Sequence, residues 1–248
     1  MKITLYVDIV SPFAYVAYHI LRHNPAFKAC EITYIPVFLG GIMKTAGNTA
    51  PIYIHNKDKW INQERIRWAS YFSVPVVPDV PKGFPHLTLH VMRAICALVQ
   101  QQQQQTTAET GTSQSQTSPA AQKILISALD AFYDAYWVQG RIVSEKEVLS
   151  EVLGKILSSS SSSSSSSTTG SGNSNVEQIL TLATTEGKKI LQANTDQAYA
   201  EGAFGLPWMV CENNKGEKEG FWGVDHLGCV LEFLGIEKPR SGGWRAML

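Results

Sequence analysis

The chain has 248 residues, of which 44% are hydrophobic, and its 21 lysines and arginines balance 21 aspartates and glutamates. A neutral chain of this length can bury a substantial core, but it offers no basic surface for nucleic acid or for an anionic membrane. It contains no run of about 18 or more apolar residues, so we expect no membrane-spanning helix.

The four cysteines are widely spaced, each in an apolar context: Cys30, Cys96, Cys211 and Cys229. They form no Cys-x-x-Cys pair and no metal-type cluster, so we expect buried free thiols in a reducing compartment. His86 and His90 have the spacing of two metal ligands, but no third ligand lies near them in the sequence. We therefore expect an intracellular protein without a metal; cytoplasm, mitochondrion and peroxisome all remain open.

Residues 2–18 predict a strand that leads directly into a helix, because apolar side chains first alternate and then recur at helical spacing. Ser11 suits the N-cap of that helix, and Pro12 suits its first position. The unpaired N–H groups of a first helical turn favour an anion. This corner is therefore a candidate ligand site.

The middle of the chain has a mainly helical pattern. It follows a second strand at 31–38, parallel to the first, and a helical turn at 40–47. Helices are predicted at residues 58–72, 87–98, 124–136, 144–157, 176–186 and 188–201. Two low-complexity runs interrupt them, one rich in glutamine at 100–118 and one rich in serine at 158–175. Neither run can bury enough apolar surface to offset its ordering entropy, so we expect mobile loops.

The chain then returns to a sheet, with predicted strands at 208–211 and 219–222 and a closing helix at 225–234. Pro207 opens a strand, which indicates an edge, a turn or a cis peptide. The order βαβ, helices, ββα resembles an α/β thioredoxin fold interrupted by an all-helical insertion. The predicted parts are a thioredoxin-like domain at 1–57 and 188–248 and an insertion at 58–187.

Five short segments span the chain outside the two polar runs. They are Asp8-Ile9-Val10-Ser11-Pro12-Phe13, residues 40–48, residues 85–93, Gly202-Ala203-Phe204-Gly205-Leu206-Pro207 and Phe221-Trp222-Gly223-Val224-Asp225. As an ordered set they resemble the kappa-class glutathione transferases, a family that also includes bacterial 2-hydroxychromene-2-carboxylate isomerases. Where thiol-disulfide enzymes of the fold carry Cys-x-x-Cys, this chain has Ser11-Pro12-Phe13-Ala14.

The resemblance implies a glutathione site. Ser11 matches the catalytic serine, which donates a hydrogen bond to the glutathione thiolate. Leu206, ahead of a presumed cis-Pro207, matches the residue whose peptide pairs with the glutathione cysteine. The other matched positions are Asn48, near the peptide, Lys57, at the glycyl carboxylate, and Val224 and Asp225, at the γ-glutamyl end.

Two positions depart from the family pattern. Val224 stands where serine or glutamine is common, so only its backbone N–H remains as a donor, and His226 stands where arginine is usual. Affinity for glutathione is therefore expected to be lower than is typical. Outside the resemblance, Lys57 would be an ordinary surface charge and Asp225 an ordinary helix cap.

The sequence therefore predicts a kappa-class glutathione transferase that activates the thiolate for attack on a small electrophile or peroxide. One alternative is a glutathione-dependent 2-hydroxychromene-2-carboxylate isomerase, and another is a non-catalytic binding module on the same scaffold. A disulfide oxidoreductase is disfavoured by the corner without cysteine. Neither nucleic acid nor a membrane is an expected partner, and a homodimer is possible because family members often form one.

Overall fold

The computed structural model describes residues 1–110, 115–161 and 171–247. Compactness divides the chain into two units, one of Met1–Val80 with Asn194–Leu248 and one of Pro81–Ala193. The boundaries between the units follow Val80 and Ala193. Both lie further along the chain than the boundaries proposed from the sequence, which follow residues 57 and 187. The first unit contains the sheet and every predicted ligand-binding residue.

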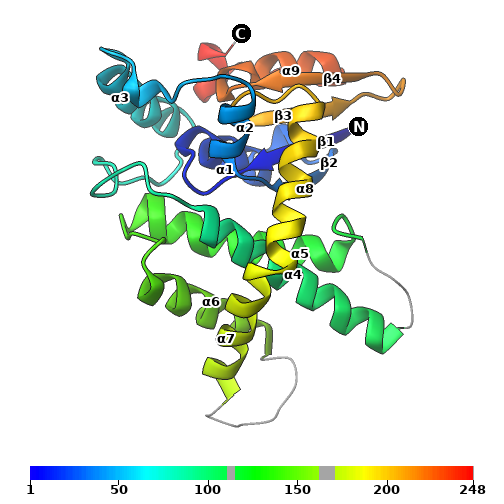
Figure 1. Cartoon of the computed structure of the whole chain (residues 1–248). Helices are drawn as coiled ribbons and strands as arrows, with labels where there is room; N and C mark the ends of the chain where they lie inside the picture. Colours follow the sequence, from blue (N-terminus) through cyan, green and yellow to red (C-terminus); the bar gives the residue numbers. More distant parts are fainter. Residues whose placement is uncertain (111–114, 162–170, 248) are drawn as a thin grey trace. The chain divides into compact units, whose positions relative to one another are not determined.

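The first unit is built on a four-stranded sheet in the order β2-β1-β3-β4 (Figure 1). Its strands are β1 (Lys2–Val7), β2 (Glu31–Pro36), β3 (Trp208–Glu212) and β4 (Lys218–Trp222). β1 pairs with β2 in parallel and with β3 in antiparallel orientation, and β4 pairs antiparallel with β3. The predicted βαβ and ββα segments therefore meet in one sheet.

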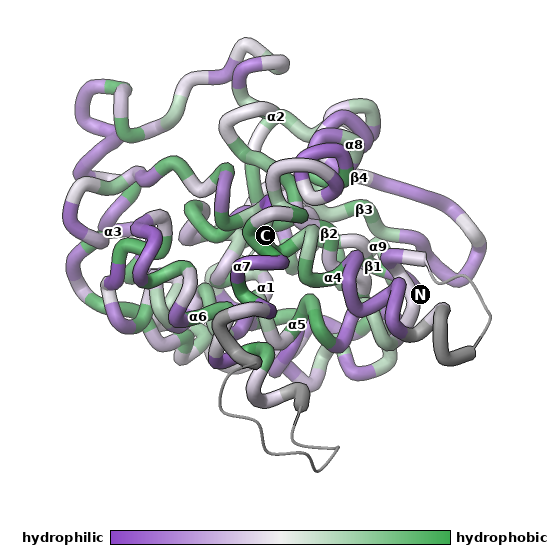
Figure 2. Tube along the Cα trace, turned by 60° about the horizontal axis from the view of Figure 1, so that its bottom comes forward, coloured by the Kyte–Doolittle hydropathy of each residue, from purple (hydrophilic) through white to green (hydrophobic). Residues whose placement is uncertain are grey.

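Alternation along the strands gives the sheet two covered faces. Ile3, Leu5 and Val7 are fully buried on the face against which α1 (Pro12–His23) lies. Tyr6 and Trp208 belong instead to a second core cluster, with Ile42 of α2 and Ala198 of α8. The turn between β3 and β4 is hydrophilic (Figure 2).

The remaining elements of the first unit are short, apart from α3. They are η1 (Pro25–Phe27), α2 (Leu39–Thr45), η2 (Pro51–Tyr53), α3 (Lys57–Tyr71), η4 (Val224–His226), α9 (Leu227–Leu234) and η5 (Gly242–Ala246). Gly47 follows α2 with φ 66°, a left-handed conformation that favours glycine after a helix. After α3 the chain has prolines at positions 75 and 78. Arg65 of α3 donates to the Val77 and Pro78 carbonyls at 2.9 and 2.6 Å, which fixes this segment against the helix.

The second unit is helical throughout its described elements. It contains α4 (Leu89–Thr110), α5 (Pro119–Tyr133), a π-helical turn (Asp134–Val138), α6 (Lys146–Ser161), α7 (Ser171–Thr184) and most of α8 (Glu186–Ala200). α4 packs against both α5 and α7, and α6 packs against α5 and α7. At Gly187 an added Cβ would collide with the Arg93 carbonyl, so α8 approaches α4 closely there. No helix within the described ranges has the length and hydropathy that crossing a bilayer requires.

The prediction of a loop over the glutamine run is wrong for residues 100–110. These residues continue α4, and Gln103 is buried with 6% of its surface exposed. The preceding apolar segment nucleates the helix, and glutamine extends it at little cost because its helix propensity is good. Residues 111–114 lie outside the described residues.

The serine run is also partly helical, contrary to the prediction. Residues 158–161 end α6, and residues 171–175 begin α7, while 162–170 lie outside the described residues. Ser158 and Ser159 donate to the carbonyls of Lys155 and Ile156 at 3.0 and 2.9 Å. Serine hydroxyls can bond back to the preceding helical turn, so composition alone does not end a helix here.

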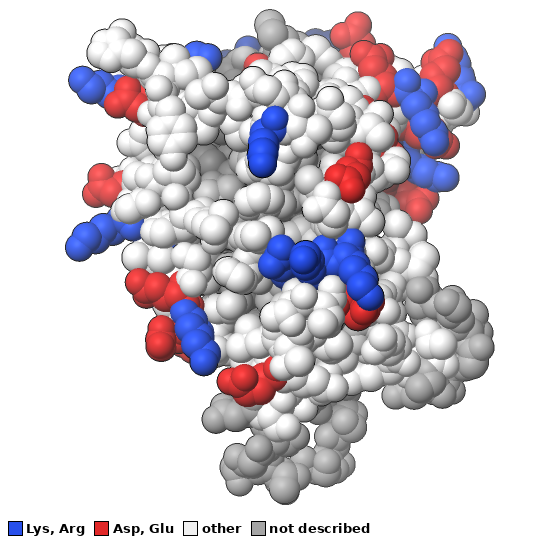
Figure 3. Space-filling model, in the orientation of Figure 1, with Lys and Arg blue, Asp and Glu red and all other residues white. Residues whose placement is uncertain are grey.

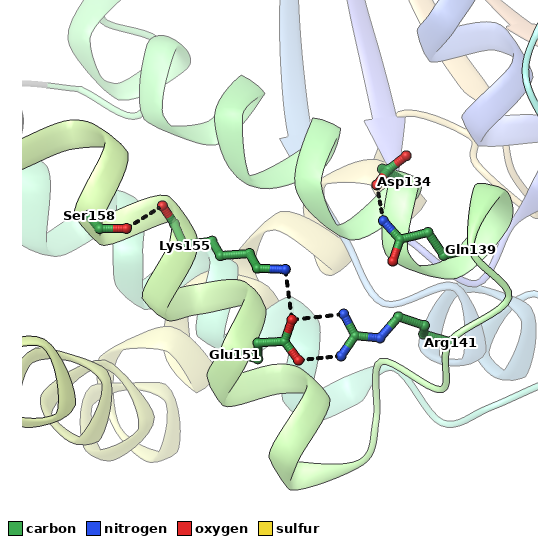
Figure 4. A network of polar contacts seen from close by, with 6 residues as sticks. All are labelled: Asp134, Gln139, Arg141, Glu151, Lys155 and Ser158. Atoms are coloured by element: carbon green, nitrogen blue, oxygen red, sulfur yellow. Dashed lines mark hydrogen bonds and ion pairs between the residues drawn. The ribbon is translucent and has the colours of Figure 1, made fainter.

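A surface network joins α6 to the loop before it (Figure 4). Glu151 accepts from Arg141 at 3.1 and 2.5 Å, and its carboxylate also lies 2.7 Å from the Lys155 ammonium. The hydrogen bond from Arg141 is the main reason that the pKa of Glu151 is lowered to about 2. Because these side chains are exposed to solvent, the network contributes little to stability.

Candidate functional site

The corner between β1 and α1 has the predicted capped geometry. Ser11 is the N-cap with φ −86° and ψ 113°, its Oγ accepts from the Ala14 N–H at 3.1 Å, and Pro12 occupies the first turn. Ser11 is buried, with 4% of its surface exposed. Capping uses the hydroxyl oxygen only as an acceptor, so the O–H proton can still be donated to an anion beside the first turn.

The loop before β3 lies at the same edge of the sheet. Tyr6 pairs with Trp208 across the antiparallel β1–β3 ladder, so the chain leaves β1 toward Ser11 where it enters β3 from Pro207. The Leu206–Pro207 peptide is cis, as predicted. The Leu206 side chain is buried in the core cluster that also holds Ala14 of α1.

The Leu206 backbone is available for a ligand. Among the described residues, neither its N–H nor its C=O makes a hydrogen bond within the chain. A buried peptide without partners is costly, because its donor and acceptor have lost water. An extended peptide lying alongside would satisfy both groups in the manner of an added strand.

Asn48, which follows α2, is hydrogen-bonded to the cis-proline loop before β3. Its Nδ2 donates to the Phe204 carbonyl at 2.8 Å, and its own N–H donates to the Met43 carbonyl at the same distance. Lys57 is the exposed first residue of α3, a helix that contacts α1. Its predicted approach to the other site residues stays a prediction.

Val224 and Asp225 lie in the 3-10 turn η4, which contacts α1. The closing helix begins only at Leu227, later than predicted, because Gly223 turns the chain with φ 93°. The Gly223 N–H donates to the Pro207 carbonyl at 3.1 Å, which joins this turn to the cis-proline loop. Val224 is buried, whereas the Asp225 side chain is 46% exposed and available to a ligand cation.

His226 faces its neighbour in the sequence. Its Nδ1 lies 3.4 Å from the Asp225 carboxylate, which makes an ion pair only when the imidazole is protonated. A positive charge on His226 would therefore compete with a ligand ammonium for Asp225. The departure from the arginine usual in the family thus changes the charge available at this end of the site.

Residues 8–14, which form the corner between β1 and α1, contain no cysteine. Burial raises the pKa of Cys96, and burial is the main cause that raises the pKa of Cys211 to about 12, so both thiols stay protonated at neutral pH.

His86 contacts the Tyr136 hydroxyl at 2.8 Å, and no group of three metal-ligating side chains occurs among the described residues. Acidic and basic side chains are interspersed on the face shown in Figure 3.

Sequence reasoning gave no role to three residues that the structure places here. Asp8 is fully buried directly before the Ser11 corner. Phe204 and Trp222 are 39% and 43% exposed, and their ring centroids are 5.1 Å apart beside the cis-proline loop. For Asp8 the sequence did contain a signal, because an acidic residue directly follows an apolar strand. The contact between Phe204 and Trp222, 18 positions apart, had no signal in the sequence.

The chain is similar to known proteins in sequence. A family model described as a DSBA-like thioredoxin domain matches residues 2–117. Glutathione S-transferase kappa 1 of Caenorhabditis elegans is 23% identical over 245 residues, which cover 96% of this chain and 92% of the relative. The rat glutathione S-transferase kappa 1 is 25% identical, covering 93% and 89%. Over nearly its whole length the chain is therefore similar in sequence to kappa-class glutathione transferases.

Solved structures support the fold. A 2-hydroxychromene-2-carboxylate isomerase superposes with a TM-score of 0.63 at 18% identity and covers 95% of both chains. The cytosolic disulfide reductase DsbM of Pseudomonas aeruginosa, solved with GSH, gives 0.54 at 14% identity, covering 95% of this chain and 96% of that one. The prediction of an α/β thioredoxin fold with a helical insertion is confirmed.

Proposed function

We propose that the chain is a glutathione-dependent transferase of the kappa class. It holds glutathione as the thiolate at the start of α1 and presents the sulfur to a small electrophile or peroxide. The observation that carries this proposal is that the capped Ser11 hydroxyl and the unpaired Leu206 peptide lie at one edge of the sheet. One binds a negative charge and the other binds an extended peptide.

Ser11 is the proposed catalytic residue, acting as a hydrogen-bond donor rather than as a nucleophile. A hydrogen bond to a charged group contributes about 1.5–3 kcal/mol, and a helix N-terminus about 0.3–1 kcal/mol. At about 1.36 kcal/mol per pKa unit, a thiol that starts near 8.5 falls to roughly 6–7. The sulfur is then largely ionised at neutral pH without a basic side chain.

The other proposed ligand contacts follow the shape of the tripeptide. The Leu206 peptide, set by Pro207, pairs with the cysteinyl residue. Asp225 takes the γ-glutamyl ammonium, and the Val224 N–H takes the adjacent carboxylate. Asn48 lies near the peptide, and Lys57 meets the glycyl carboxylate.

Two reactions need only this thiolate. In conjugation the sulfur forms a bond to an electrophilic carbon, and the leaving group departs with the bonding electrons. In peroxide reduction the sulfur attacks the O–O bond, which yields an alcohol and a glutathione sulfenic acid once protons are taken up. A second glutathione then gives the disulfide and water.

The structural match with an isomerase of chromene carboxylates favours one alternative. That reaction would use the same sulfur as a transient nucleophile and release it unchanged, and it would also require a group to hold the substrate carboxylate. A non-catalytic binding module remains a second alternative. A homodimer remains part of the proposal and is checked by analytical ultracentrifugation.

Titration calorimetry with glutathione, combined with a turnover panel, tests the proposal. The panel comprises conjugation of an aryl halide, reduction of a peroxide and isomerisation of a chromene carboxylate. We expect binding at submillimolar to millimolar glutathione and turnover in one of the first two reactions. No binding at millimolar glutathione would refute the transferase, whereas binding without turnover in any assay would favour the binding module.

A further inference from the structure

Asp8 is a fully buried acid that the proposed chemistry does not use. It follows the last residue of β1 and has 0% of its surface exposed. Both carboxylate oxygens accept backbone N–H groups, Oδ1 from Val10 at 3.2 Å and Oδ2 from Leu39 at 2.9 Å. Burying a carboxylate is costly unless such bonds compensate for the lost water. Its presence therefore calls for a reason beyond filling space.

Asp8 determines the conformation of the corner that carries Ser11. The Asp8 carbonyl accepts the Ser11 N–H at 3.1 Å, while its side chain accepts the Val10 N–H in the same loop. Val10 and Ser11, the last two residues of the connection from β1 to the N-cap, are therefore both bonded to Asp8. The direction of the Ser11 hydroxyl follows from this connection, because the cap allows a short side chain little other freedom.

The same carboxylate reaches a second ligand-binding segment. Leu39 is the first residue of α2 and lies 31 residues from Asp8 in the chain. The far end of α2 leads through Gly47 to Asn48, whose N–H donates back to the Met43 carbonyl. Asp8 thus links the segment of Ser11 to the segment of Asn48.

We propose that Asp8 is a positioning residue for the thiolate site. Its buried carboxylate ties the Ser11 corner to the start of α2, so that the hydroxyl and the Asn48 amide keep fixed places around one ligand. The inference rests on the proposed function, because it concerns the sulfur that Ser11 would bind. An apolar residue of similar size would fill the same volume without desolvation, but it would leave the Val10 and Leu39 N–H groups without their acceptor.

Replacing Asp8 by asparagine keeps the size of the side chain and removes one acceptor. The amide NH2 must then face the N–H of either Val10 or Leu39, which sets a donor against a donor. We expect the loop to move and the bond from Ser11 to the thiolate to weaken. In Asp8→Asn the pKa of the bound glutathione thiol should rise by about one unit, so the thiolate band at pH near 6.5 should fall roughly fivefold.

A double-mutant cycle tests whether Asp8 acts through Ser11. The ultraviolet thiolate band of bound glutathione is titrated against pH in the wild type, Asp8→Asn, Ser11→Ala and the double variant, and amide hydrogen exchange is followed at residues 10, 11 and 39. Glu212→Gln is the control for loss of a carboxylate charge, because Glu212 lies at the end of β3 that is away from Pro207. We expect a raised midpoint and faster exchange at all three amides in Asp8→Asn, and no further midpoint shift when it is added to Ser11→Ala.

Other results would overturn the inference. An unchanged midpoint with only a lower melting temperature would make Asp8 a structural residue. A lowered midpoint would mean that its charge repels the thiolate rather than positioning its donor, and additive shifts in the cycle would separate it from Ser11. A wild-type protein with no thiolate band would instead refute the proposed function, and with it the catalytic consequence drawn for Asp8.

Discussion

Ser11→Ala should separate two roles of one hydroxyl. The Ser11 Oγ caps α1 through the Ala14 N–H at 3.1 Å, so its loss should lower the free energy of unfolding by about 1 kcal/mol. Loss of the donor to the thiolate is worth about 1.5–3 kcal/mol, which raises the pKa of the bound thiol by about one to two units. With a rise of about 1.5 units from near 6.5, the ionised fraction at pH near 7 falls roughly eightfold.

The chain contains a matched control for the capping role. Ser118 caps α5 in the same way, with Pro119 in the first turn and its Oγ accepting from the Ala121 N–H at 3.3 Å. Ser118→Ala should therefore cost a similar amount of stability without changing glutathione chemistry. Urea denaturation measures the first effect in both variants, and pH titration of the ultraviolet thiolate band measures the second.

The reasoning fails if the thiolate midpoint of Ser11→Ala equals that of the wild type. It also fails if Ser118→Ala shifts the midpoint as much, because the effect would then reflect general loosening of the fold. Turnover should follow the ionised fraction, so kcat/KM at pH near 7 should fall by the same factor. A normal kcat/KM with a weakened band would show that the hydroxyl acts only on the ground state.

Three further changes test other parts of the structure. In Gly205→Ala the new Cβ would lie 2.9 Å from the Trp222 Nε1, so the indole must move. We expect a several-fold higher Kd for glutathione by calorimetry. An unchanged Kd would contradict the close fit at Gly205. Tyr6 donates to Glu201 at 2.7 Å, and burial followed by that carboxylate raises the pKa of Tyr6 above its ordinary 10.0. Stability should therefore decline above pH about 10 in the wild type and less in Tyr6→Phe, as followed by urea midpoints. The ionised Glu151 carboxylate contributes a small, salt-sensitive stability that is present above pH 4.5 and is lost as the pH falls toward about 2. Glu151→Gln should remove this contribution from acid-unfolding curves.

The sequence alone determined the local geometry of the site. Ser11 and Pro12 mark a capped helix start, and Pro207 marks an unusual peptide, because such signals act within a few residues and need no distant partner. The alternation of β1 similarly predicts which side chains of the strand face a core. Composition was misleading in both polar runs, because α4 extends to Gln103 and beyond and the ends of α6 and α7 extend into the serine run.

Only the tertiary structure decided which segments meet. Asn48 bonds to Phe204 across 156 positions, and Asp8 bonds to Leu39 across 31, as a result of the strand order β2-β1-β3-β4. No local pattern specifies such pairs, because a carboxylate or an amide can satisfy itself with many backbone partners. The unpaired peptide of Leu206 likewise depends on the tertiary structure, because a peptide group lacks a partner only in relation to the segments around it.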